Sequence, residues 1–150
     1  MNKEKSIVVL NSLIEINSER IEIYKTAKKV TIEDDLKDLF SEFEEISTRF
    51  KSELVEEVQK MGGVPIVVRN NNLFLRLWVN FKSKLIGQDR EDILNTLEYN
   101  EFVIIKNYRD ILSTNLENLT YELHIKLKAQ QLLIKAHHDK VKKLGDLMLS

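Results

Sequence analysis

Residues 58–73 read VQKMGGVPIVVRNNNL, and this stretch decides which architecture the rest of the chain can adopt. It holds a Gly-Gly step at Gly62 and Gly63, the only proline of the chain at Pro65, and three consecutive asparagines. Glycine tolerates the left-handed conformation at a helix end, and proline cannot continue a helix. The stretch therefore predicts a long break between two helical halves of the chain.

Each half is expected to be a pair of amphipathic helices, because apolar residues recur at spacings of three and four. The four expected helices run from Ser6 to Val30, from a Thr31 cap to Met61, from near Asp89 through Ile111, and from near Asn115 to Gly145. Residues 73–86 are expected to form a short helix inside the long break. Short, long and short connections are typical of a four-helix bundle with one crossover. We therefore expect an all-α fold, with residues 1–150 forming a single domain.

The amino-acid composition argues against several classes of function. The chain carries 23 basic and 24 acidic residues, which argues against the basic surface that broad nucleic-acid binding requires. It has no cysteine, so disulfides and thiolate metal sites are excluded. No stretch approaches the roughly 18 apolar residues of a membrane span. We expect a cytoplasmic protein with no membrane partner.

Charge is distributed unevenly along the helices. Residues 33–60 contain ten acids and four bases, whereas residues 126–143 contain six lysines and one acid, Asp139. One interpretation is that two faces of opposite sign attract each other within the bundle. The alternative is a docking surface for a charged partner.

Four polar residues fall inside the expected apolar stripes, one on each long helix. They are Asn17, Ser47, Glu101 and Gln130. Each lies near the middle of its helix, so all four are expected at one depth whichever way the helices run. The sequence therefore predicts a buried polar layer whose members need hydrogen-bond partners.

This layer lies at the depth where bundles of this kind hold two metal ions. Such sites use a Glu from each of two helices and a Glu-x-x-His pair from each of the other two. Neither pair is present here: Thr48 follows Glu45 at the required position, and Lys135 stands three residues before His138. The residues favour a structural layer without a metal cofactor; a site for iron or another divalent metal remains the alternative.

Aromatic residues in the expected crossover helix form a separate candidate. Phe74, Trp78 and Phe81 share one face of residues 73–86 and are expected to cover the bundle. The alternative is an interface with a partner or with a second copy in a homodimer, since aromatic residues are enriched at interfaces.

Several short motifs resemble those of an uncharacterised bacterial family of ferritin-like four-helix-bundle proteins. They are Leu13-Ile14-Glu15-Ile16-Asn17 with Tyr24, the run from Phe50 to Pro65, Trp78, Glu98-x-x-Glu101 with Tyr108, and Ala136-His137-His138-Asp139. The resemblance implies a ferritin-like bundle and no established reaction. It also marks Glu98, Glu101 and His138 as family-pattern positions. The chain departs from the pattern at Tyr99-Asn100, where the family usually has glycine.

Three functions are consistent with these features. The first is a non-enzymatic stress-related or interaction protein that has kept the bundle without a complete dinuclear metal site. The second is a weak metal-binding or oxidase-type protein that uses Glu98, Glu101 and His138. The third is a helical module that binds a partner through the Trp78 segment.

Overall fold

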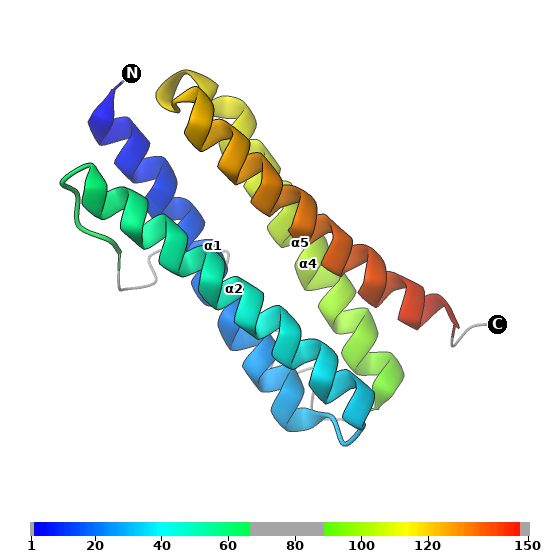
Figure 1. The fold of residues 1–150 in the computed structure, drawn as a ribbon. Helices are drawn as coiled ribbons and strands as arrows, with labels where there is room; N and C mark the ends of the chain where they lie inside the picture. Colours follow the sequence, from blue (N-terminus) through cyan, green and yellow to red (C-terminus); the bar gives the residue numbers. More distant parts are fainter. Residues whose placement is uncertain (1, 67–88, 148–150) are drawn as a thin grey trace.

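The computed structural model describes residues 2–66 and 89–147, and long helices dominate this part of the chain (Figure 1). The helices are α1 (Lys3–Val30), α2 (Asp34–Lys60), α4 (Arg90–Thr114) and α5 (Tyr121–Leu147), with a short 3₁₀ helix η2 (Leu116–Asn118) before α5. The four long helices confirm the predicted all-α class. The helix predicted over residues 73–86 lies outside the described residues.

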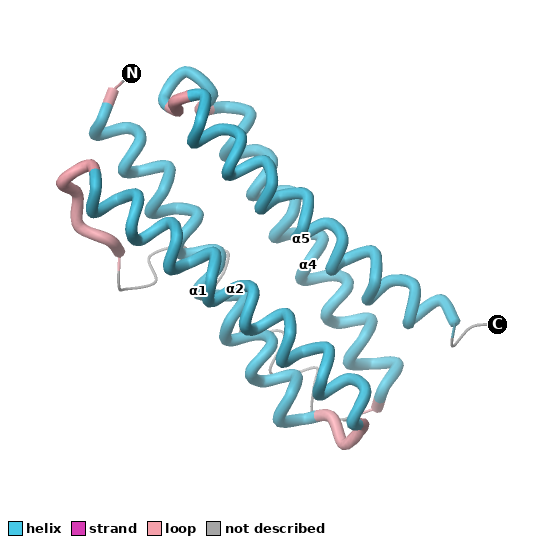
Figure 2. The backbone as a smooth tube through the Cα atoms, viewed as in Figure 1, coloured by secondary structure: helices cyan, strands magenta, loops and turns pink. Residues whose placement is uncertain are grey.

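The helices form two antiparallel hairpins that lie side by side (Figure 2). α1 pairs with α2, and α4 pairs with α5. α4 begins at the end of the bundle where α1 turns into α2, so α2 and α4 run in the same direction (Figure 1). A connection between two parallel helices must return along the whole bundle, which is why the long break falls between Lys60 and Arg90.

The core is made by the apolar stripes of all four long helices. Its fully buried members include Leu10, Leu13, Ile14, Tyr24, Phe40, Phe43, Leu97, Tyr108 and Leu127. Burial of α1 extends beyond its apolar face. Glu15 and Glu19 are buried in addition to the apolar residues of the helix. Ile23 lies in the core, whereas Ile21 is only half-buried.

The two ends of α2 test the helix-boundary signals in the sequence. The predicted Thr31 cap is wrong: Thr31 ends α1, and α2 is preceded by Glu33, whose side chain makes no capping bond. The Thr31 hydroxyl instead accepts a hydrogen bond from the Glu33 N–H at 3.2 Å, within the turn. The glycine stop is confirmed, because Gly62 adopts φ +78° and the Gly63 N–H donates to the Val58 carbonyl.

The predicted boundaries of the last helix are wrong at both ends. α5 begins at Tyr121 rather than near Asn115, because η2 intervenes and leaves Leu116 exposed. The Thr120 hydroxyl accepts from the Leu123 N–H at 3.2 Å, which is the usual geometry of a helix N-cap. α5 also continues through Gly145 to Leu147.

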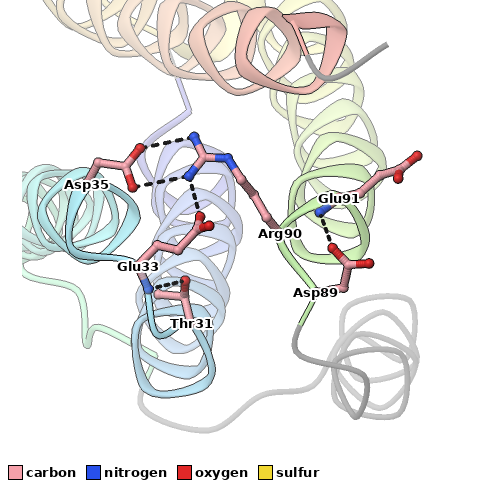
Figure 3. A network of polar contacts seen from close by, with 6 residues as sticks. All are labelled: Thr31, Glu33, Asp35, Asp89, Arg90 and Glu91. Carbon is pink, nitrogen blue, oxygen red and sulfur yellow. Dashed lines mark hydrogen bonds and ion pairs between the residues drawn. The ribbon is translucent and has the colours of Figure 1, made fainter.

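Polar contacts tie the hairpins together at both ends of the bundle. At the α1–α2 turn, Arg90 at the start of α4 forms two hydrogen bonds to Asp35, at 3.1 and 3.0 Å, and an ion pair with Glu33 (Figure 3). At the opposite end, the Ser6 hydroxyl donates to the Asn118 carbonyl.

The opposite charges of α2 and α5 meet along the side of the bundle. Lys126 contacts Glu57 at 3.2 Å, and Lys140 lies 3.9 Å from Glu42. These contacts favour the interpretation that the two charged faces attract each other within the bundle. Among the described residues, no helix has a stretch long and apolar enough to cross a bilayer.

Candidate functional site

The centre of the bundle holds a buried positive charge. Arg20 of α1 is 1% exposed, and its Nη1 donates to Asn17 Oδ1 at 2.9 Å. The rings of Tyr24 and Phe50 lie 5.8 and 5.9 Å from the guanidinium carbon, close enough for cation–π attraction. Arginine remains protonated in proteins, so this group is a permanent cation in the core.

His137 of α5 is the second partner of this cation. Its Nδ1 lies 3.4 Å from Arg20 Nη2, and its ring stacks on Phe43 with centroids 4.1 Å apart. Burial, reinforced by the charge of Arg20, lowers the pKa of His137 from 6.5 to about 4. The imidazole is therefore neutral near pH 7. Because a guanidinium can only donate, Nδ1 must be the unprotonated nitrogen that accepts.

A second polar chain runs from the core to the surface through Glu101 of α4. The Tyr24 hydroxyl donates to Glu101 Oε2 at 2.5 Å, and His138 Nδ1 lies 3.7 Å from Glu101 Oε1. Contact with Glu101 raises the pKa of His138. Burial, with the nearby negative charge of Glu101, raises the pKa of Tyr24 well above its usual value. Tyr24 therefore stays a hydrogen-bond donor to this carboxylate.

A third polar chain links α4, α5 and α2. The Tyr108 hydroxyl donates to Gln130 Oε1, and Gln130 Nε2 donates to Glu53 Oε2 at 3.1 Å. Burial raises the pKa of Tyr108, which keeps its hydroxyl protonated. The chain ends at Glu53, whose side chain is 35% exposed.

The four residues expected to form the polar layer are all buried, but they do not bond to one another. Asn17 belongs to the Arg20 network, Glu101 to the Tyr24 chain and Gln130 to the Tyr108 chain. The Ser47 hydroxyl donates to the Phe43 carbonyl one turn back, within its own helix. Their hydrogen-bond partners are largely side chains that the polar-layer prediction did not include.

Arg20 is the main residue that sequence reasoning missed. Asn17, Arg20 and Tyr24 follow one another at spacings of three and four, so the signal was present in the stripe. A long cationic side chain is usually assigned to the surface, because charged residues are rarely fully buried.

A groove opens on the outer side of the α4–α5 hairpin, next to the Glu101 chain. Its volume is about 510 Å³, and its lining residues are Asn95, Glu98, Tyr99, Phe102, His138 and Lys142. Of the three family-pattern residues, Glu98 and His138 line this groove, and Glu101 lies behind His138. The candidate interface residues Phe74, Trp78 and Phe81 lie outside the described residues.

Comparison with solved structures supports the ferritin-like fold. One similar crystal structure comes from Bacillus anthracis str. Ames and is described as that of ferritin-like, diiron-carboxylate proteins. Its TM-score against this chain is 0.75, and the sequence identity is 17%. The match covers 97% of this chain and 99% of the other. No curated protein sequence matches. At this identity the likeness establishes the fold alone.

The described residues of this chain do not fit a diiron centre. Nowhere among them do three His, Asp or Glu side chains gather closely enough to hold a metal ion. The His137 nitrogen that faces the core is occupied by Arg20, and Glu101 is occupied by Tyr24 and His138. A guanidinium among these side chains would also repel a divalent cation, because Coulomb repulsion is strong in a poorly solvated interior.

A family model provides the remaining comparison. The model of a domain of unknown function, DUF2383, matches residues 5–114, which include most of α1 and the whole of α2 and α4. Together with the structural match, this confirms the expected likeness to an uncharacterised ferritin-like family. The chain belongs to the DUF2383 family of domains of unknown function.

Proposed function

We propose that this protein is a non-enzymatic, ferritin-like bundle that works as a stress-related or interaction protein without a dinuclear metal centre. The observation that carries the proposal is Arg20, buried at the centre of the bundle with His137 and Asn17 as its partners. The guanidinium of Arg20 thus places a positive charge in the interior of the bundle. Side chains that could otherwise bind metal are engaged in hydrogen bonds and ion pairs, so the bundle keeps its shape without iron.

Metal content tests this proposal. The protein is purified without chelators, analysed for bound metal, and then titrated anaerobically with Fe(II). We expect far less than one metal per chain and no tight uptake. Tight uptake of two iron equivalents would refute the proposal, because a dinuclear centre would then have formed despite Arg20.

A second candidate function has one favourable observation. Glu101 and His138 are already in contact at 3.7 Å, and Glu98 lines the same groove as His138. These three residues could give a weak mononuclear metal site. Metal binding there would have to displace the proton that Glu101 favours on His138.

The two candidates are separated by a single substitution. If the weak metal site exists, Glu101→Ala removes whatever metal co-purifies, whereas Glu42→Ala on the exposed face of α2 leaves it in place. Equal metal content in both variants rejects the second candidate. The third hypothesis, a partner interface at Trp78, remains a prediction: Trp78→Ala should change the oligomeric state or the partners retained while the helical content is preserved.

A further inference from the structure

The groove on the outer side of the α4–α5 hairpin has the size of a small-molecule site. Its volume of about 510 Å³ lies within the range of roughly 300–1,000 Å³ that ligand pockets occupy. None of its lining residues contacts the Arg20 guanidinium directly; His138 is linked to it through Glu101 and Tyr24. The metal-free proposal therefore leaves its role open.

One wall of the groove is aromatic. Tyr99 and Phe102 lie three residues apart on α4 and are 53% and 59% exposed. Both side chains line the groove, so they form an apolar patch on the surface of α4. They offer a flat apolar platform to a planar or branched hydrocarbon group.

The polar part of the groove contains charges of both signs. Glu98 provides a carboxylate, Lys142 an ammonium group and Asn95 an amide. His138 turns Nδ1 inward to Glu101, and neither Nδ1 nor Glu101 Oε1 is accessible to water.

Contact with Glu101, reinforced by the charge of Glu98, raises the pKa of His138. Within the groove itself, the ammonium group of Lys142 on α5 and the carboxylate of Glu98 on α4 provide one charge of each sign.

These features select for a ligand that carries both charges. A simple anion would be repelled by Glu98, and a simple cation would be repelled by Lys142. We propose that this groove binds a free α-amino acid with an aromatic side chain. Its carboxylate accepts from Lys142 Nζ, its ammonium donates to Glu98, and its ring packs on Tyr99 and Phe102.

The experiment uses the full chain and three probes of similar shape. L-phenylalanine carries both charges, phenylacetate lacks the ammonium group, and phenethylamine lacks the carboxylate. Binding is followed by NMR at neutral pH and constant ionic strength, through the backbone amides of α4 and α5. We expect saturable shifts with L-phenylalanine, and at least fivefold weaker binding of the other two. Absence of saturable shifts, or equal binding of all three, overturns the proposal.

Variants at the two charged ends should differ in their effect on phenylacetate. Glu98→Gln should weaken L-phenylalanine at least fivefold while leaving phenylacetate unchanged or tighter, because the repelling carboxylate is gone. Lys142→Met should weaken both. Lys128→Met is the matched control, since Lys128 also lies on α5 but lines a different surface hollow. An equal loss in Lys128→Met and Lys142→Met would reduce the effect to general surface charge and reject the site. These outcomes are independent of metal content, so either proposal can fail alone.

Discussion

His137 and His138 are adjacent in the chain, yet the bundle places their rings in opposite electrostatic environments. Successive residues on a helix point about 100° apart, so one ring enters the core while the other faces the α4–α5 groove. Burial and Arg20 lower the pKa of His137 to about 4, whereas Glu101 raises the pKa of His138. The pKa values of the two rings are therefore shifted in opposite directions, His137 toward the neutral form and His138 toward the protonated form.

The two histidines should affect stability in opposite directions as pH changes. Below pH 6.5 the unfolded chain protonates His137 but the folded chain does not, so its contribution falls as pH drops toward 4. The full loss is about 3 kcal/mol, at about 1.4 kcal/mol per pKa unit. The contribution of His138 is complete below its ordinary pKa of 6.5 and is lost as pH rises through its raised value.

Urea unfolding of His137→Gln and His138→Gln between pH 4 and 8 checks this prediction. The difference from the native chain should shrink toward acid for His137→Gln and shrink toward alkaline pH for His138→Gln. His124→Gln, another histidine of α5, is the matched control. Parallel profiles for all three variants would contradict the assigned environments.

At the level of secondary-structure elements, the N-terminus of α4 is held by contacts with the turn between α1 and α2, which is distant in the sequence. Asp89 caps α4 by accepting from the Glu91 N–H, while Arg90 reaches across to Asp35 and Glu33 at the α1–α2 turn (Figure 3). The hydrogen bonds from Arg90 lower the pKa of Asp35. The contact fastens the second hairpin to the first at the end where the long crossover rejoins the bundle.

Arg90→Gln should raise the pKa of Asp35 back toward 3.8, because the charge that favours its carboxylate is removed. Carboxyl carbon NMR measures this shift directly. Hydrogen exchange of the first turn of α2 should become faster, with only a small decrease in the midpoint of thermal unfolding, since the pair is solvent-exposed. Arg109→Gln, an exposed arginine farther along α4, should leave Asp35 unchanged; an equal shift in both variants would contradict a specific contact.

Considered as a whole molecule, the bundle is joined at its centre by Arg20. This α1 residue contacts α5 through His137 and α2 through the ring of Phe50. A buried cation is costly unless its partners are in place. The same network that holds the helices together therefore makes the centre unsuitable for a second cation.

Arg20→Met should destabilise the protein by about 1–3 kcal/mol, because Asn17 and His137 lose a donor while remaining buried. Urea unfolding at pH 7 measures the change. Arg49→Met is a close control, since Arg49 also lies 5.6 Å from the centre of the Phe50 ring but is 59% exposed. Adding His137→Phe to Arg20→Met should recover part of the loss by removing the acceptor left unpaired. Unchanged stability in Arg20→Met would contradict the role of the network.

The sequence by itself predicted the four long helices of the described residues, their grouping into two hairpins and the burial of Asn17, Ser47, Glu101 and Gln130. These features follow from periodicity and from glycine and proline signals, which act within a few residues of the chain. Boundaries set by competing local bonds, such as the turn around Thr31 and the start of α5, were predicted less well.

Only the tertiary structure decided which polar groups meet. Tyr24 and Glu101 are 77 residues apart, and Arg20 and His137 are 117 apart. No local pattern specifies such pairs, because they depend on how four helices are rotated and aligned against one another. The burial of Arg20 depends on the same packing, because a cation is stable in the core only where side chains of other helices can interact with it.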